Sequence, residues 1–329
     1  MSTQTSTTTA PAAGKAKGPD RWAWVGPVMR RNGLLFFFAI LLVVFTISRP
    51  EFASQANIRN ILLSASVIGV LALGQTVVML TGGFDIGIAK TAVVAGMVVA
   101  LTANLGPIAL LLGVAATALI GLINGVLISR ANVNPFVVTL GMYTILTSVA
   151  LLVNDGGSVI NLPEWLLGLV QWQLFGLPGI IWWFAGLAVV THIALAYTRW
   201  GGHIYAVGGN AEAARLAGIK SKNVLASAYV IAAVVGGFAG VMLTARLGTA
   251  SPVALPGAEL QSIAAVVIGG TKLSGGFGSI PRTIVGVLIL AAMQSGLVLM
   301  GVNPYYQGMF NGAILILAVA VDVIFSKKK

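Results

Sequence analysis

Long apolar runs separated by short polar connections occupy most of the 329-residue chain. A helix that crosses a bilayer needs about 20 predominantly apolar residues, and the runs are close to that length. With ends that shift by a few positions, we expect about ten transmembrane helices. Their apolar cores are residues 34–47, 61–81, 86–102, 107–129, 136–153, 180–197, 224–244, 263–273, 284–300 and 309–325. The pattern predicts an all-α polytopic membrane protein.

The polar stretch of residues 199–223 interrupts this pattern in the second half of the chain. We expect Gly208 and Gly209 to interrupt regular structure, because glycine destabilises the interior of a helix or strand. Asn210 is a favourable N-cap, and residues 211–217 are mostly strong helix formers. The stretch therefore predicts a short helix that begins after Asn210.

Charges and a glycine define this short helix further. Glu212 falls in the first turn, where the helix dipole favours an anion, and Arg215 follows three residues later on the same face. Gly218 is expected to end the helix in a left-handed conformation. A helix of about two turns is not stable alone in water, so it needs a surface to dock against. A solvated loop helix between two spans is the alternative interpretation.

Composition and charge agree with a membrane protein. Hydrophobic residues make up 57% of the chain and charged residues 8%, whereas a soluble domain carries about 25% charged residues. The net charge of +11 comes mainly from basic residues in short loops and at the chain ends. This distribution follows the positive-inside rule with both termini in the cytoplasm, and it argues against a nucleic-acid partner. The stretch 199–223 is then cytoplasmic as well.

These assignments divide the chain into three parts. Residues 1–31 are expected to form a disordered cytoplasmic tail, because the segment begins Ser/Thr/Ala-rich and then becomes basic. Residues 32–325 form the transmembrane domain, and residues 326–329 form a basic cytoplasmic tail. The longest external connection, residues 154–178, is rich in aromatic side chains, which we expect to line the membrane interface.

Two glycine-rich loops do not have the spacing of a phosphate-binding site. Residues 80–91 and 269–279 both contain Gly-Gly-Phe, but neither has the GxxxxGK[ST] spacing of a phosphate-binding loop. An internal duplication is one interpretation of the shared tripeptide. Close helix packing and broken helices that line a cavity are the other interpretations, and the sequence leaves all three open.

The sequence offers no catalytic constellation. His192 and His203 have no carboxylate near them in the sequence, and no metal-ligand spacing or nucleophile with a base is found. Lys90, near the end of an apolar run, can snorkel to the cytoplasmic face. The absence of cysteine excludes disulfides, thiol catalysis and thiolate metal sites. We therefore expect a protein that is not an enzyme and holds no metal.

Several longer motifs resemble one family. They are residues 199–210 (RWGGHIYAVGGN), 212–219 (EAARLAGI), 134–141 (NPFVVTLG), 259–271 (ELQSIAAVVIGGT), 81–86 (TGGFDI) and 318–322 (AVAVD). Together they look like the ribose/xylose-type permeases, the membrane subunits of bacterial ABC sugar importers, over nearly all of the chain after residue 50. Lys90, Arg282 and Ser295 depart from the pattern usual in that family.

The resemblance implies a homodimeric permease of the bacterial inner (plasma) membrane with a cytoplasmic coupling helix at residues 210–218. That helix would dock on a separate ATP-binding cassette subunit, which uses the ATP, so this chain needs no cofactor of its own. A periplasmic or lipid-anchored binding protein would deliver a pentose, hexose or similar polyol. The residues expected to couple the permease to the ATPase are Gly208, Gly209, Asn210, Glu212, Ala213, Ala214, Arg215, Leu216 and Gly218.

The spans carry hydroxyl and amide groups but almost no charge, which favours a small neutral polyhydroxylated cargo. A polar cargo inside a membrane needs such hydrogen-bond partners. The candidate pathway residues are Gln75, Asn124, Thr139, Tyr143, Thr144, Gln294 and Ser295. Each of them can instead bond only to a neighbouring helix. A secondary transporter of a sugar or another small neutral solute is the alternative function, although such proteins commonly carry ionisable relays inside the membrane.

Overall fold

The computed structural model describes residues 25–303 and, beyond them, residues 306, 308–310, 312, 313, 316 and 320. The tail segment 1–24, most of the expected last span at 309–325 and the basic tail at 326–329 lie outside the described residues.

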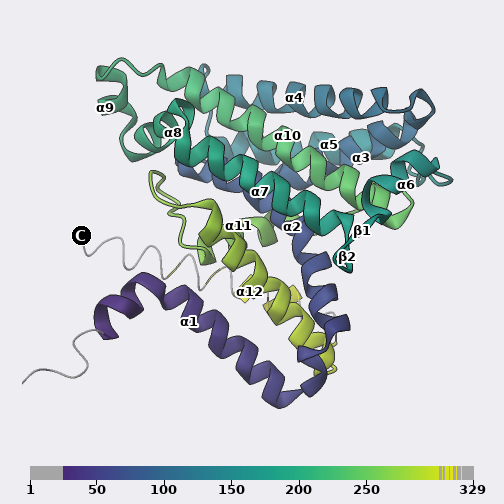
Figure 1. Ribbon diagram of the computed structural model, residues 1–329. Helices are drawn as coiled ribbons and strands as arrows, with labels where there is room; N and C mark the ends of the chain where they lie inside the picture. The colour runs from purple at the N-terminus through teal and green to yellow at the C-terminus, as the bar shows by residue number, and fades with distance from the viewer. Residues whose placement is uncertain are drawn as a thin grey trace, which may run out of the picture.

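Helices make up nearly all of the regular structure in the described part of the chain (Figure 1). The longer helices are α1 (Val25–Ser48), α2 (Gln55–Leu80), α3 (Ile88–Leu101), α4 (Ile108–Ser129), α5 (Pro135–Leu152), α7 (Gly179–Tyr197), α10 (Ser221–Leu247), α11 (Ala258–Ile268) and α12 (Ile280–Leu299). Within the described residues, α2, α4, α5, α7, α10 and α12 are long and apolar enough to cross a membrane. Residues 33–48 of α1, together with α3 and α11, are shorter apolar helices. The predicted all-α polytopic fold is confirmed.

Each apolar core predicted before residue 300 has a helix at or close to its position. At α11 both ends are shifted: the helix occupies Ala258–Ile268 and not residues 263–273. The helix ends at Ile268 because Gly269 and Gly270 follow it, and Gly270 takes a φ of +82°. The prediction placed the span too late because the first turns of α11 contain the polar residues Glu259, Gln261 and Ser262, and because it extended past the glycine pair to Leu273.

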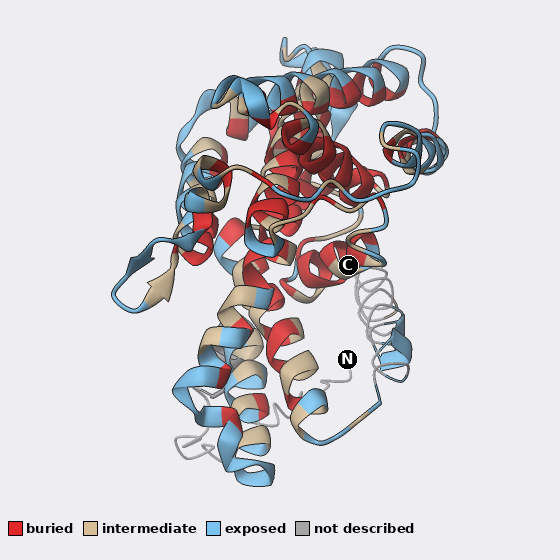
Figure 2. Cartoon of the chain, turned by 90° about the vertical axis from the view of Figure 1, so that its right-hand side faces the viewer, coloured by how far each residue is buried: buried red, intermediate tan, exposed pale blue. Residues whose placement is uncertain are grey.

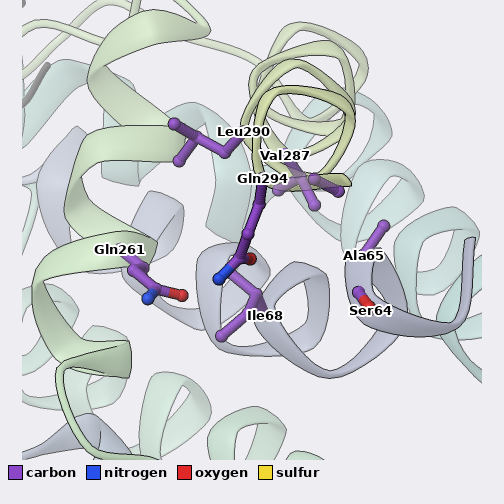
Figure 3. A pocket seen from close by; sticks show the side chains of 8 residues that line it. Ser64, Ala65, Ile68, Gln261, Val287, Leu290 and Gln294 are labelled. Carbon is purple, nitrogen blue, oxygen red and sulfur yellow. The ribbon is translucent and has the colours of Figure 1, made fainter. Parts of the chain in front are cut away.

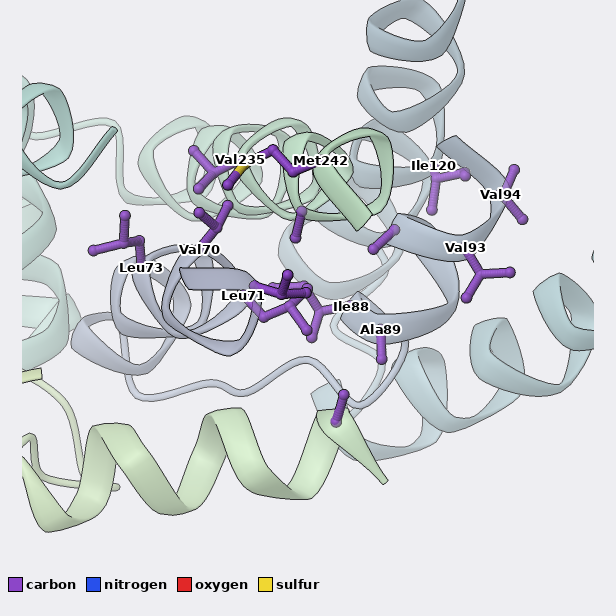
Figure 4. Packing of buried hydrophobic residues seen from close by; sticks show 14 of the residues in the cluster. Val70, Leu71, Leu73, Ile88, Ala89, Val93, Val94, Ile120, Val235 and Met242 are labelled. Carbon is purple, nitrogen blue, oxygen red and sulfur yellow. The ribbon is translucent and has the colours of Figure 1, made fainter. Parts of the chain in front are cut away.

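Helix α2 lies at the centre of the molecule. In its most apolar window 72% of the residues are buried, against 17% for α5, which is therefore peripheral. Side chains of α2, α3 and α10 meet in one large apolar cluster (Figure 4). Glycines allow the helices to approach closely: a Cβ added to Gly240 of α10 would lie 1.7 Å from the carbonyl oxygen of Ala92 in α3.

A second apolar cluster joins α1, α11 and α12 to α2. Figure 1 shows α1 and α12 on the side of α2 away from α4, and Figure 2 shows that buried residues concentrate between the helices while their outer faces are exposed. Many of the exposed side chains are large and apolar, among them Leu111, Leu119, Val137 and Val190. This is the surface that lipid-facing helices present.

The connections carry a few shorter elements. They are the 3₁₀ helices η1 (Pro50–Ala53) and η2 (Ala103–Leu105), helices α6 (Glu164–Gln171), α8 (Arg199–Gly209) and α9 (Ala211–Leu216), and strands β1 (Gln173–Leu174) and β2 (Leu177–Pro178). The two strands pair antiparallel in a hairpin within the connection 154–178. Its aromatics have different surroundings. Trp165 Nε1 donates to the carbonyl oxygen of Ala103 at 3.1 Å, whereas Phe175 is exposed.

Candidate functional site

The short helix predicted after Asn210 is α9, and its ends are those the sequence predicted. The Asn210 side-chain oxygen accepts a 2.9 Å hydrogen bond from the backbone N–H of Ala213, which is an N-cap. At the other end Gly218 takes a φ of +83°, and its N–H donates to the carbonyl oxygen of Arg215 at 3.0 Å. A left-handed glycine of this kind is a common way to end a helix.

Helix α9 presents a charged and partly apolar outer face. The Arg215 guanidinium donates from Nε to the Glu212 carboxylate at 3.0 Å, and both side chains are about two-thirds exposed, at 64% and 65%. The hydrogen bond from Arg215, helped by its charge, lowers the pKa of Glu212. Ala214 is buried against the rest of the protein, whereas Leu216 is 76% exposed. Among the described residues, nothing covers this outer face.

Helix α8 comes directly before α9 and was not predicted. Thr198 caps its start, with Oγ1 accepting from the N–H of Gly201 at 3.2 Å. Trp200 Nε1 donates to Ser227 Oγ of α10 at 2.9 Å, and Ile204 is fully buried. The available signal was Thr198 itself, together with apolar residues at helical spacing inside a stretch that reads as polar.

A groove lies beside α9, between α8 and the start of α10. Its volume is about 580 Å³, and its lining residues are Trp200, His203, Ala217, Gly218, Ile219, Lys220, Asn223, Val224 and Ser227. Three of these residues, Ala217, Gly218 and Ile219, directly follow α9. The helix pair and the groove together form an uneven surface on one end of the molecule.

Four of the candidate pathway residues form hydrogen bonds within the protein: Gln75, Thr139, Thr144 and Ser295. The Gln75 amide, in the orientation that satisfies both its groups, exchanges two 3.1 Å hydrogen bonds with the backbone of Asp85. Thr139 Oγ1 donates to the carbonyl oxygen of Pro135 at 2.8 Å, and Thr144 Oγ1 to that of Leu140 at 3.2 Å. Asn124 is fully buried, and neither polar atom of its side chain has a hydrogen-bond partner among the described residues.

Gln294 and Ser295 lie on α12 in different surroundings. Ser295 Oγ donates to Asn57 Oδ1 at 2.7 Å. Gln294 lines a cavity with Ser64 and Gln261, and Figure 3 shows the amides of Gln261 and Gln294 directed into the same space. The cavity measures about 20 Å³, which holds about one water molecule and no sugar. Of the seven candidates, only Gln294 lines this cavity in the described part of the chain.

The structure brings together three residues that the sequence did not connect. Lys90 of α3 is 6% exposed, so it does not snorkel as expected, and its ammonium lies 5.5 Å from the centroid of the Tyr143 ring in α5. Glu259 of α11 is 8% exposed and close enough to interact electrostatically with both. No carboxylate of the described residues forms a salt bridge with Lys90. The three helices meet only in the tertiary structure, so no local signal pointed to this group.

The chain is similar to known membrane permeases over most of its length. Residues 57–319 match the family described as "Branched-chain amino acid transport system / permease component". The ribose import permease protein RbsC of Bacillus subtilis is 36% identical over 309 residues, covering 90% of this chain and 93% of that one. The L-arabinose ABC transporter permease protein AraH of Azospirillum brasilense is 34% identical over 319 residues, covering 95% and 94%.

A third relative is the D-allose transport system permease protein AlsC of Escherichia coli (strain K12), 33% identical over 302 residues, covering 90% of this chain and 93% of that one. No solved structure matches the chain. The similarity to permeases extends over nearly the whole length, and the resemblance inferred from the motifs is confirmed. The chain therefore belongs to the family of permease subunits of bacterial ABC importers, which are transport proteins of the inner membrane.

Proposed function

We propose that the chain is the membrane-spanning subunit of an ATP-driven importer that carries a monosaccharide, either a pentose, a hexose or a related polyol, into the bacterial cytoplasm. The observation that carries this proposal is the similarity to permeases of ribose, L-arabinose and D-allose, each over at least 90% of the chain. The family description refers to branched-chain amino acids, which makes an amino acid the second candidate cargo. The three sugar permeases favour the sugar.

In this proposal α9 is the coupling helix and docks on a separate ATP-binding subunit in the cytoplasm. The exposed Glu212–Arg215 pair, the exposed Leu216 and the adjacent groove support the assignment, because they offer both charge and apolar area to a partner. A helix as short as α9 also gains little stability from propensity alone. The ATP is bound and hydrolysed by the partner, and this chain contributes no nucleotide site.

A second copy of the chain and a sugar-binding protein complete the proposed assembly. Among the described residues, the cavity that Gln294 lines is too small for a sugar, which favours a path formed between two copies over one through that cavity. Of the seven candidates, Tyr143, Thr144, Gln294 and Ser295 are at least partly exposed. They are the residues best able to meet a passing cargo, whereas Gln75, Asn124 and Thr139 are buried within the chain.

The test is reconstitution of the complex encoded with this permease. A tagged permease is purified with its neighbours, the partners are identified by mass spectrometry, and the complex is placed in ATP-loaded proteoliposomes. Uptake of labelled ribose, arabinose, allose and leucine is then compared with and without the recovered binding protein. We expect recovery of an ATPase and a binding protein, and uptake of at least one sugar that depends on both.

Leucine uptake without sugar uptake would replace the proposed cargo by an amino acid. Sugar uptake by the permease alone, with no ATPase recovered, would instead favour a secondary transporter. ATP hydrolysis by the purified permease alone, free of other proteins, would contradict the assignment of ATP to a partner.

A further inference from the structure

Three segments that are far apart in the sequence meet at backbone contact distance beside the end of α8. They are the end of α2 with the loop 81–87, Gly208 and Gly209 at the end of α8, and the loop 269–279 between α11 and α12. The N–H of Gly276 donates a 2.9 Å hydrogen bond to the carbonyl oxygen of Leu80. We call Leu80, Gly82, Gly208, Gly275 and Gly276 the glycine junction.

Gly208 occupies the centre of the glycine junction and leaves no room for a side chain. A Cβ at Gly208 would lie 1.7 Å from the carbonyl oxygen of Leu80 and 2.7 Å from the nitrogen of Gly276. Both of these neighbours are backbone atoms, so neither can swing away as a side chain can. Alanine at position 208 would therefore push α8 away from at least one of the two loops.

The loop 269–279 depends on glycine for two reasons. Gly275 and Gly276 take φ values of +83° and +71°, which other residues rarely adopt. A Cβ at Gly275 would also lie 2.6 Å from the nitrogen of Gly82, and one at Gly276 would lie 2.7 Å from Cα of Gly209. The two Gly-Gly-Phe loops of the sequence are thus direct neighbours, and close packing accounts for their glycines.

A side-chain contact fixes α8 to the same loop a second time. The Tyr205 hydroxyl donates a 3.0 Å hydrogen bond to the carbonyl oxygen of Gly278. Two points of attachment, one at Gly208 and one at Tyr205, hold the orientation of α8 relative to the loop as well as its distance. The helix cannot rotate or slide without moving the loop or breaking these contacts.

Both loops lead directly into membrane helices that are joined to others. The loop 269–279 continues into α12, where Thr283 Oγ1 lies 2.8 Å from Thr76 Oγ1 of α2 in a buried hydrogen bond. The loop 81–87 continues into α3, and its Phe84 carbonyl accepts from the Tyr229 hydroxyl of α10 at 3.4 Å. A displacement of α8 thus reaches α2, α3, α10 and α12 through contiguous contacts.

We propose that the glycine junction passes the displacement of the coupling segment α8–α9 to the two loops and their membrane helices, and that Gly208 and Tyr205 are positioning residues for transport. This proposal rests on the proposed function of α9. Packed backbone cannot absorb a shift by changing rotamers, so such a contact transmits motion where a layer of flexible side chains would dissipate it. In this proposal α9 docks on the ATP-binding subunit, whereas Gly208 and Tyr205 of α8 pass the resulting motion to the membrane helices.

The chain provides a matched control on the same helix. Gly202 also belongs to α8, and a Cβ there would meet nothing within 4 Å. Gly208→Ala and Gly202→Ala each add one methyl group to the same element. Tyr205→Phe is an independent variant that removes only the hydroxyl bonded to Gly278.

The experiment uses the full complex of permease, ATP-binding subunit and binding protein in proteoliposomes. Sugar uptake and ATP hydrolysis are measured on the same vesicles, together with the amount of ATP-binding subunit that copurifies. For Gly208→Ala we expect normal copurification and sustained hydrolysis, but sugar uptake lowered roughly tenfold, within the usual range of coupling between sites. Tyr205→Phe should show a smaller loss of the same kind, and the control variant Gly202→Ala should resemble the wild type.

Normal uptake by both Gly208→Ala and Tyr205→Phe would overturn the proposal. Loss of the ATP-binding subunit from the complex in either variant would also overturn it, because the junction would then serve docking. If Gly208→Ala does not reach the membrane, Tyr205→Phe decides the question alone. A wild-type complex without ATP-dependent uptake would contradict the proposed function itself, an outcome distinct from any defect limited to the variants.

Discussion

The ammonium of Lys90 lies 5.5 Å from the centroid of the Tyr143 ring, and both groups are close to the buried carboxylate of Glu259. A cation over an aromatic face is stabilised by the ring quadrupole, and an opposite charge nearby adds a favourable electrostatic interaction. The three side chains come from α3, α5 and α11, so they hold three membrane helices at one point.

Lys90→Met is expected to destabilise the protein, because it keeps the length of the side chain but leaves Glu259 buried without its countercharge. Removing one member of a buried pair in direct contact costs about 3–5 kcal/mol. Here the expected cost is smaller, because the two charges do not form a direct salt bridge. Thermal unfolding of the detergent-solubilised protein should show a lower midpoint for Lys90→Met and a partial recovery for the double variant Lys90→Met/Glu259→Gln. Strictly additive losses would show that the two charges act independently.

Gly240→Ala is expected to loosen the contact between α10 and α3. Its added methyl group would lie 1.7 Å from the Ala92 carbonyl oxygen, and overpacking of this kind typically costs about 1–3 kcal/mol. Gly141→Ala on α5 is the matched control, because a Cβ there meets nothing within 4 Å. The measurement is again thermal unfolding in detergent. Equal midpoints for the two variants would mean that the helices separate at little cost.

Arg215→Glu is expected to abolish sugar uptake and leave the amount of permease in the membrane unchanged. Arg215 is exposed and bonds only to Glu212 among the described residues, so the fold loses little, whereas reversal of an interfacial charge weakens docking at least about tenfold. Copurification of the ATP-binding subunit measures the docking. Arg130→Glu, an equal charge reversal at the exposed end of α4, is the control and should copurify normally. Normal uptake by Arg215→Glu would remove α9 from the docking surface.

The absence of cysteine from the chain makes the orientation directly measurable. Ala213→Cys places a single thiol on the exposed face of α9, and Phe175→Cys places one on the exposed hairpin between β1 and β2. A membrane-impermeant maleimide added to intact spheroplasts should label position 175 and spare position 213. After the cells are broken, both should react. Labelling of position 213 in intact spheroplasts would reverse the orientation inferred from the basic residues.

The parts of the site that could be predicted are those that are encoded locally. Asn210 and Gly218 act on backbone groups within a few residues, so the bounds of α9 follow from the sequence alone. The burial of Lys90 could not be predicted, because it depends on Tyr143 and Glu259 in helices that meet α3 only after folding. The glycine junction has the same origin. Its glycines are visible in the sequence, but which backbone each one faces depends on the packing of α2, α8 and the loop 269–279.

The fold itself was predictable to a greater extent, because long apolar runs require membrane helices whatever their partners are. The error at α11 shows the limit of that argument. The polar residues Glu259, Gln261 and Ser262 hide the start of α11 from a hydropathy argument. The glycine pair at Gly269 and Gly270, of which Gly270 has a positive φ, ends the helix before Leu273.

Sugar uptake by the complete complex is expected to persist when a protonophore collapses the proton gradient, provided that ATP remains. Two observations favour this outcome. The exposed candidates on the proposed path, Tyr143, Thr144 and Gln294, are hydroxyl and amide groups that suit a neutral cargo. Two of the nearby ionisable groups, Lys90 and Glu259, are buried, whereas a proton relay needs groups that exchange protons with each side of the membrane. Uptake is measured in ATP-loaded proteoliposomes with and without the protonophore, and vesicles lacking ATP give the background. Uptake that disappears while ATP is still present would make the gradient the energy source and would favour a secondary transporter. Uptake that depends on ATP alone would show that the partner docked on α9 supplies the energy for transport.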